Sequence, residues 1–353
     1  MTVVPDQVTK FQYTSKSMQK IFDFSGIVNT IQWLTDLTTA GQLTFRLLRG
    51  KLINPNFDFE PQAGDSVIFE WNNQRIFKGW VFQRELTEDD NWQITAYDAT
   101  RYLKGTGSYA FNALSSSERF TKICQDIGIP YKDLDFDTWR SPAEIADGRT
   151  YFDMIQSAMN WSYQNLGKRF FLTDDGNGTI LHTSTAMSQT DEIFTDKSLM
   201  TAMDFIGSID SNVANYVLIV YQNSGNNSRQ LYTAQDKDSM SKWGALAYST
   251  NATGDNLNAA QLQNQANTTL KAMNREVITL KLTVLGNEKF KAGTGCKVSL
   301  PVLENAGLPA NSKCFCTRVT QNFDNPWTMD LELVPENSNG FLGDNQVLTE
   351  YGD

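Results

Sequence analysis

The chain has 353 residues, and an excess of Asp and Glu over Lys and Arg gives it a formal net charge of −10 at pH 7. That charge disfavours stable nucleic-acid binding, because binding to phosphates depends on Lys and Arg side chains. The length predicts two or three domains, and a hydrophobic content of 40% is enough for packed cores. The sequence has no apolar run of about 20 residues, so no membrane span is predicted. The first residues lack the pattern of a secretory signal.

Residues 1–110 are predicted to form a first β-barrel-like domain. Its strands show alternating or β-rich composition and are expected over residues 10–14, 43–48, 67–71, 75–86 and 92–97. Asn72 and Asn73 separate two of them, and Asn tolerates a positive φ, so a tight hairpin turn is predicted there.

Residues 111–190 are predicted as a small α+β insert. Asp98 is predicted to cap a short helical turn just before it, and Ser115 with Glu118 has the pattern of a capping box that starts a helix ending at Gly128. A loop through Pro130 and Pro142 leads to a second amphipathic helix that ends by Gly167. A hairpin over residues 168–183 follows, with its turn at 174–178.

Residues 191–335 are predicted as a second β-barrel-like domain with helical excursions, and residues 336–353 as an extended arm. Strands are expected over 203–209, 213–221, 229–233, 276–284, 296–300, 315–323 and 327–334. The excursions are a short helix over 236–243 and a longer one over 256–274, whose apolar stripe is Leu257, Leu262, Ala266 and Leu270. The predicted fold is therefore mainly β, with two tandem barrel-like domains flanking a small α/β domain.

The two β regions share an order of features. A Gly turn at Gly64 or Gly293 enters a strand, a strand with Val81–Gln83 or Val319–Gln321 follows, and an Asp-Asn turn then leads to Trp92 or Trp327 and a closing strand. This order predicts two domains of related topology, and chance similarity of two hairpins is the alternative. A homotrimer of such a chain would present six similar units in a closed ring.

The residue types that carry chemistry are sparse. Cys314 and Cys316 have a C-x-C spacing, without the second pair of a zinc site, so they are predicted as buried core residues, as are Cys124 and Cys296. His182 is the one histidine and lies on a predicted strand with no nucleophile motif nearby, which favours a solvated or hydrogen-bonded structural role.

Two pairs of adjacent carboxylates, Asp89/Asp90 and Asp174/Asp175, lie in predicted turns. Glycoside hydrolysis needs two carboxyls held about 5–10 Å apart across a cleft, and turn formation explains these pairs better. No catalytic, cofactor-binding or metal-ligating residue is therefore predicted, and the chain is expected not to be an enzyme. Trp71, Trp80 and Trp92 offer an alternative as sugar-stacking residues, but core packing is their expected role.

Three runs of sequence, at residues 92–103 (WQITAYDATRYL), 123–130 (ICQDIGIP) and 151–155 (YFDMI), resemble the baseplate hub proteins of contractile tails. The relatives are hubs of Gram-positive myophages, PBSX-like defective prophages and phage-tail-like bacteriocins, allied to the late-control gene D group. The resemblance implies a homotrimer with a pseudo-sixfold ring that joins the hexameric tail tube to the trimeric central spike. It also implies contacts with LysM-type or wedge baseplate proteins.

By the same resemblance, the protein would assemble in the bacterial cytoplasm and then reside in a phage or bacteriocin particle. Two alternatives remain open at this point. One is a distal tail protein of a non-contractile phage, and the other is a tail-associated protein that binds or hydrolyses cell wall.

Overall fold

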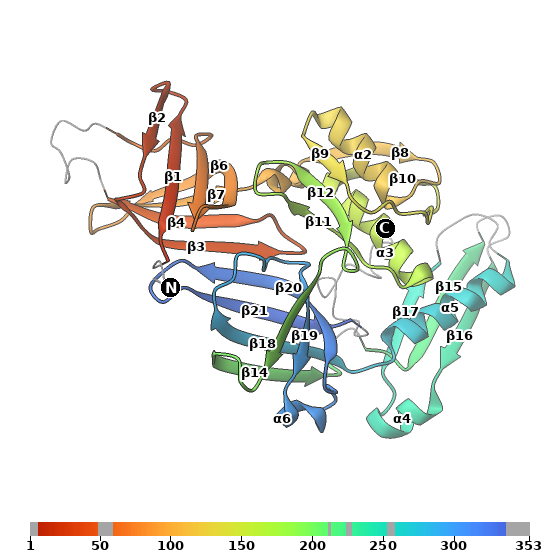
Figure 1. Ribbon diagram of the computed structural model, residues 1–353. Coiled ribbons are helices and arrows are strands. Elements are labelled where there is room, and N and C mark those ends of the chain that lie inside the picture. Colours follow the sequence, from red (N-terminus) through yellow and green to blue (C-terminus); the bar gives the residue numbers. More distant parts are fainter. Residues whose placement is uncertain (1–5, 49–58, 211–212, 224–227, 253–257, 337–353) are drawn as a thin grey trace.

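The computed structural model describes residues 6–48, 59–210, 213–223, 228–252 and 258–336 (Figure 1). The predicted arm at 336–353 lies outside these residues except for Glu336, as does Leu257 of the predicted apolar stripe. The chain is mainly β, as the sequence predicts, with antiparallel pairing through most of its largest sheet. No helix among the described residues is long and apolar enough to cross a membrane.

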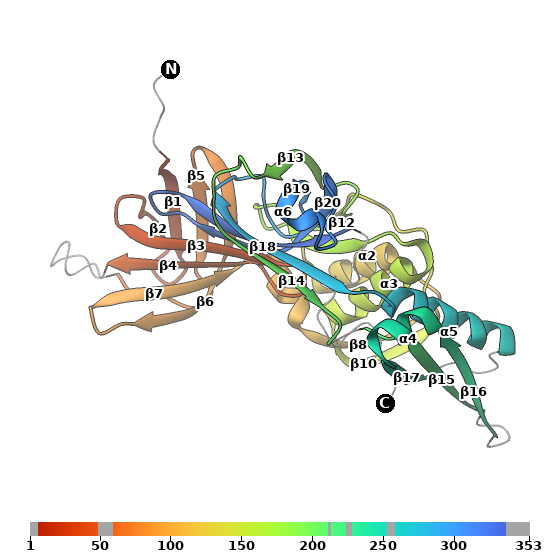
Figure 2. The same ribbon diagram turned by 90° about the horizontal axis from the view of Figure 1, so that it is seen from below.

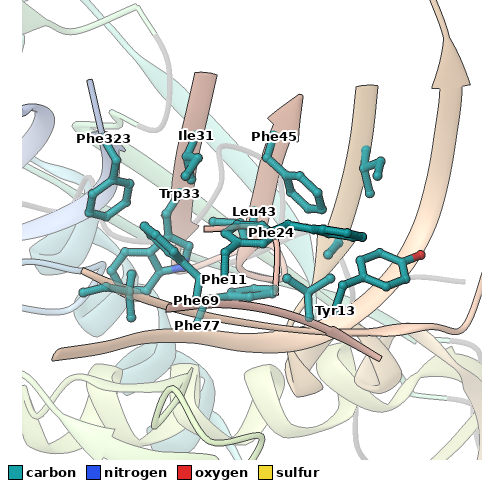
Figure 3. Close-up of a cluster of buried hydrophobic side chains, with 14 of the residues drawn as sticks. Phe11, Tyr13, Phe24, Ile31, Trp33, Leu43, Phe45, Phe69, Phe77 and Phe323 are labelled. Carbon is teal, nitrogen blue, oxygen red and sulfur yellow. The ribbon is translucent and has the colours of Figure 1, made fainter. Parts of the chain in front are cut away.

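The first β region is a curled antiparallel sheet with the strand order β3-β4-β7-β6-β5-β1-β2. Its strands are β1 (Val8–Ser15), β2 (Lys20–Asp23), β3 (Val28–Asp36), β4 (Gln42–Leu48), β5 (Ser66–Trp71), β6 (Gln74–Leu86) and β7 (Asn91–Tyr97). Alternate side chains of these strands point inward, so Phe11, Phe45 and Phe69 are fully buried in one aromatic core (Figure 3). Asn72 and Asn73 both have positive φ, and the predicted hairpin turn is confirmed.

The insert packs two helices against two small sheets. Its elements are η1 (Ala99–Lys104), β8 (Thr106–Phe111), α2 (Ser116–Ile127), β9 (Tyr131–Asp133), β10 (Glu144–Thr150), α3 (Tyr151–Leu166), β11 (Phe170–Asp174) and β12 (Ile180–Ser184). The predicted capping box of Ser115 and Glu118 is present, and Gly128 ends α2 in the left-handed conformation. The predicted loop between the two helices is wrong in part, because it contains β9 and β10.

The second β region contains β13 (Gln189–Thr195), β14 (Met200–Ser208), β18 (Val277–Leu285), β19 (Gly295–Ser299), α6 (Pro301–Glu304), β20 (Ser312–Asn322) and β21 (Thr328–Pro335). Its core includes Leu280, Cys296 and Leu331. β20 is long enough to pair on one side with β21 and on its other side with two strands, β19 and β3.

The strands between β14 and β18 do not join this sheet. β15 (Tyr216–Asn223), β16 (Ser228–Gln235) and β17 (Ala247–Asn251) form a separate sheet in the order β16-β15-β17, accompanied by α4 (Lys237–Trp243) and α5 (Ala259–Met273). α5 covers this sheet with Leu262 and Ala266, both from the predicted stripe and both fully buried. Figure 2 places this small unit and the first β region at opposite ends of the molecule.

The two β regions repeat one strand order, which confirms the predicted duplication. The order β3-β4-β7-β6-β5-β1 in the first corresponds to β14-β18-β21-β20-β19-β13 in the second. The turns that enter β5 and β19 match in their hydrogen bonds. The Gly64 amide donates to the Val81 carbonyl at 2.8 Å, and the Gly293 amide donates to the Cys316 carbonyl at 2.7 Å. One difference is that β1 is antiparallel to β5, whereas β13 is parallel to β19.

The residue-level match predicted from the sequence is wrong by three positions in β6 and β20. Val81 pairs with Ala96 and Cys316 with Leu333, each directly before a β-bulge, so Val81 corresponds to Cys316. Counting along the paired strands from these positions makes Trp92 the counterpart of Met329. Trp327 precedes β21 and has a different role, because its ring packs in the first core, 5.8 Å from Trp71. The shared tryptophan is therefore a coincidence within a genuine repeat.

Candidate functional site

The Asp89/Asp90 pair forms a turn, as predicted. Asp90 has a positive φ, and the exposed carboxylate of Asp89 accepts hydrogen bonds from Thr87 and Asn91. The hydrogen bond from Thr87 and then that from Asn91 lower the pKa of Asp89. A carboxylate that is ionised and occupied by its own turn is a poor general acid.

The Asp174/Asp175 pair also shapes a turn. Asp174 Oδ1 accepts the Gly176 amide at 2.7 Å, and Asp175 Oδ1 accepts the Asn177 amide at 2.7 Å. These local bonds explain the acidic turn without a bound calcium ion. Among the described residues, no group of three His, Cys, Asp or Glu side chains is placed to hold a metal.

Asp174 belongs to a buried polar cluster that the sequence does not predict. Asp98 caps η1 after the first β region, Asp174 ends β11 of the insert, and Lys291 precedes β19 in the second β region. The Lys291 ammonium donates to the Asp174 backbone carbonyl at 2.8 Å. The charges of Asp174 and Lys291 also act on Asp98, so the cluster includes residues from three parts of the chain.

Burial dominates the electrostatics of this cluster. It raises the pKa of Asp98 to about 7, with a further contribution from the charge of Asp174, and it raises the pKa of Asp174 to about 6. Burial also lowers the pKa of Lys291, while Asp174 and Asp98 oppose that shift. Perturbed carboxyls often mark active sites, but buried ion networks shift pKa values in the same way. These three residues come from the end of the first β region, the insert and the second β region, so we interpret the cluster as a structural contact between these parts.

We expect the Asp98→Asn variant to change how stability depends on pH. A carboxyl whose pKa is raised by folding stabilises the fold at low pH, and this contribution is lost as pH rises toward 7. The variant cannot ionise, so its unfolding free energy relative to wild type should shift in its favour by about 4 kcal/mol between pH 4 and pH 8. Urea denaturation across this range measures the shift. Asp89→Asn is the control and should show almost no shift over this range, because the pKa of Asp89 is lowered and this carboxyl titrates below pH 4.

His182 is fully buried, which confirms the hydrogen-bonded structural role rather than the solvated one. Its Nε2 lies 3.0 Å from Ser116 Oγ and its Nδ1 lies 3.0 Å from Asp133 Oδ1, a Ser-His-Asp arrangement. However, Ser116 is also fully buried and its hydroxyl donates to Asp137 at 2.7 Å. A nucleophile needs a free hydroxyl and access to substrate, so this arrangement is a packed polar core.

The cysteines are core residues, and the three tryptophans considered for sugar stacking pack against the cores. All four cysteines are free and buried, and burial raises the pKa of Cys124 and Cys314 to about 12. Thiols with raised pKa values are poor nucleophiles and metal ligands. Trp71 is buried, and Trp80 and Trp92 are partly buried against neighbouring cores, so they form no open stacking surface.

Two strand edges are further surface features. β3 pairs with β20, so the two β regions form one continuous sheet, and Figure 1 shows β4, β3, β20, β21, β18 and β14 in succession. β14 ends this series: within the described chain it pairs only with β18, and Met203 and Ile206 on it are exposed. A groove of about 250 Å³ beside it is lined by charged side chains of both signs, including Asp204, Lys281 and Glu332.

The last part of β6 has an unpaired edge as well. In the described residues its Gln83–Leu86 segment pairs with β7 on one side only, and Phe82 and Leu86 are large exposed hydrophobic side chains. Unprotected strand edges invite pairing with another chain. These two edges are therefore the candidate surface for contact with another chain.

Comparison with known proteins agrees with this kind of fold. A profile described as YQBQ-like matches residues 31–334, most of the chain. The chain belongs to the YQBQ-like family. Two relatives from Bacillus subtilis (strain 168) are each 25% identical over 249 residues, which are 69% of this chain and 74% of theirs: the uncharacterized protein YqbQ and the phage-like element PBSX protein XkdQ. The predicted resemblance to PBSX-like prophage proteins is confirmed.

The fold of this family member is also found in a solved structure. The 43 kDa tail protein of prophage MuSo2 from Shewanella oneidensis superposes with a TM-score of 0.69 and 13% sequence identity. The match covers 93% of this chain and 99% of that one. The likeness extends over both β regions and the insert.

Proposed function

We propose that the chain is the structural hub subunit of a contractile-tail baseplate. It forms a homotrimer whose six related β units make a pseudo-sixfold ring, and this ring joins the hexameric tail tube to the trimeric central spike. Neighbouring LysM-type or wedge baseplate proteins bind around it. The subunit assembles in the bacterial cytoplasm and then resides in the tail of a phage or bacteriocin particle.

The observation that carries the proposal is the duplicated strand order with an edge-to-edge contact between its two copies. A contact that uses one edge of one unit and a different edge of the next is heterologous, and such contacts close into rings when the rotation fits. A ring built from two related units per chain can meet a sixfold partner on one side and a threefold partner on the other. The similarity to a phage-like element protein and to a prophage tail protein adds support.

The same proposal treats the chain as four segments and as a protein without enzymatic activity. The segments are the first β domain at 1–110, the insert at 111–190, the second β domain at 191–335 and the arm at 336–353. The lack of activity is supported by the full burial of His182. It is also supported by the hydrogen bonds that the two aspartate pairs make within their own turns.

Light scattering on the concentrated protein, alone and with its tube and spike proteins, tests the proposal. The expected particle has three times the chain mass of 39.8 kDa and takes up both partners. A chain that stays monomeric in every mixture contradicts it. Clearing of peptidoglycan in a zymogram would contradict the non-enzymatic part.

A further inference from the structure

The two β regions contact each other through β3 and β20 inside one chain, and the repeat suggests an equivalent contact between chains. β3 of the first β region corresponds to β14 of the second, and β20 of the second β region corresponds to β6 of the first. The strands that correspond to β3 and β20 are therefore β14 and β6, and within the described residues each of them has an unpaired edge. We propose that β14 of one subunit pairs antiparallel with the Gln83–Leu86 end of β6 in the next. This inference rests on the proposed hub function and names its subunit interface.

The intrachain contact supplies a template for the pairing. β20 pairs antiparallel with β3, and Val319 lies opposite Thr35 while Thr320 lies opposite Leu34. Backbone bonds flank the paired part: the Leu37 amide donates to the Thr317 carbonyl at 3.1 Å, and the Phe323 amide donates to the Ile31 carbonyl at 2.9 Å.

The register follows from the strand pairs that both regions share. In the first region Leu43 pairs with Ala96 on one side and with Trp33 on the other. Its counterpart Leu280 pairs with Leu333 and with Phe205 in the same way. Trp33 therefore corresponds to Phe205. Val81 corresponds to Cys316 by the matching bulges. Applied to the template, these matches place Gln83 opposite Ser208, Arg84 opposite Gly207, Glu85 opposite Ile206 and Leu86 opposite Phe205.

The surface properties of both edges fit this pairing. Phe82 and Leu86 are 39% and 43% exposed, and Met203 and Ile206 are 37% and 45% exposed, so each edge presents apolar side chains that the contact would cover. β14 is nine residues long and carries neither Lys nor Pro, the residues that commonly protect a free edge. These features favour a partner strand, and the chain itself provides one of matching geometry.

The ends of the contact are polar in the template and in the predicted interface. In the template Arg318 lies 3.8 Å from Asp36, and Gln32 donates to Asn322 at 2.8 Å. In the predicted interface these positions become Gln83 with Ser208 and Thr87 with Asp204. Gln83 and Ser208 are able to hydrogen-bond, whereas the Thr87 hydroxyl already donates to Asp89, so Asp204 keeps its charge at the end of the contact that faces solvent.

Disulfide crosslinking tests the register in the full-length protein. Opposite positions in an antiparallel pair bring Cβ atoms within about 5 Å, close enough for a disulfide after small adjustment. The double variant Glu85→Cys/Ile206→Cys, oxidised with copper-phenanthroline, should give covalently linked subunits on a non-reducing gel. The native cysteines are all buried and do not compete.

Two further variants make the result interpretable. Leu34→Cys/Thr320→Cys replaces the corresponding pair of the template and should form a disulfide within one chain, which shows that the fold and the chemistry are intact. Glu85→Cys/Ile193→Cys moves one thiol to β13, a different edge strand with a similarly exposed side chain, and should give no linked subunits.

The outcomes separate this inference from the hub proposal. Linked subunits with the Glu85→Cys/Ile206→Cys variant, and none with the Glu85→Cys/Ile193→Cys variant, would support it. A trimer by light scattering in which the template pair links but the Glu85→Cys/Ile206→Cys variant does not would overturn the interface and leave the hub proposal standing. Absence of any trimer for the wild-type protein would overturn the hub proposal and this interface with it.

Discussion

Replacing Arg119 by Leu should destabilise the insert by about 3–5 kcal/mol, the range expected when one partner of a buried ion pair is removed. The Arg119 side chain is 1% exposed and pairs with Glu144. Its guanidinium also donates to Ser141 Oγ at 2.6 Å and to the Met154 carbonyl at 3.2 Å, and it lies over the Phe111 ring. The substitution removes this donor from both acceptors and from Glu144, which keeps only the weaker contacts with Ser157 and Arg149.

Arg140→Leu is the matched control on the same part of the chain. Arg140 pairs with Glu118, but its side chain is 62% exposed, so the loss should stay below about 1 kcal/mol. Amide hydrogen exchange in α2 and α3 measures the local opening free energy of both variants. Equal protection in the two variants would show that the buried pair does not hold the insert together.

Replacing Gly293 by Ala should destabilise the second β region by about 2–5 kcal/mol, and the cost has two parts, backbone strain and overpacking. Gly293 has a φ of +90°, and an added Cβ would lie 2.1 Å from the buried ring of Phe171. Phe171 packs with Phe315 and Val334, so the damage should reach the contact between the insert and the second β region.

The repeat provides the control for this prediction. Gly64 occupies the corresponding turn with a φ of +86°, but the nearest atom to an added Cβ is Lys16 Nζ at 3.9 Å. Gly64→Ala should thus cost only the strain, about 1–2 kcal/mol. Urea denaturation of both variants compares them, and a Gly293→Ala variant no less stable than Gly64→Ala would contradict the packing argument.

The sequence predicts those parts of the fold that have local signals. The capping box of Ser115 and Glu118, the hairpin at Asn72-Asn73 and the glycine turns at Gly64 and Gly293 each act through neighbouring residues, and all are present. β9 and β10 are short and mostly polar, so nothing in their own residues distinguishes them from a loop.

Features that depend on distant residues are predicted poorly. The duplication is visible in the order of turns and strands, but its register depends on bulges after Val81 and Cys316 that the sequence does not mark. The Asp98, Asp174 and Lys291 cluster and the His182 cluster bring together residues from separate parts of the chain. No short stretch of the sequence predicts either cluster.

We expect three copies of this chain to close into a ring of six related β units. End-on imaging by electron cryomicroscopy of the particle formed with its tube and spike proteins would show such a ring directly. The expected image has strict threefold symmetry, six β lobes around a channel, and a continuous sheet passing from β14 of one subunit to β6 of the next. A particle with one β lobe per subunit on the ring, or with an isologous twofold contact between subunits, would contradict it.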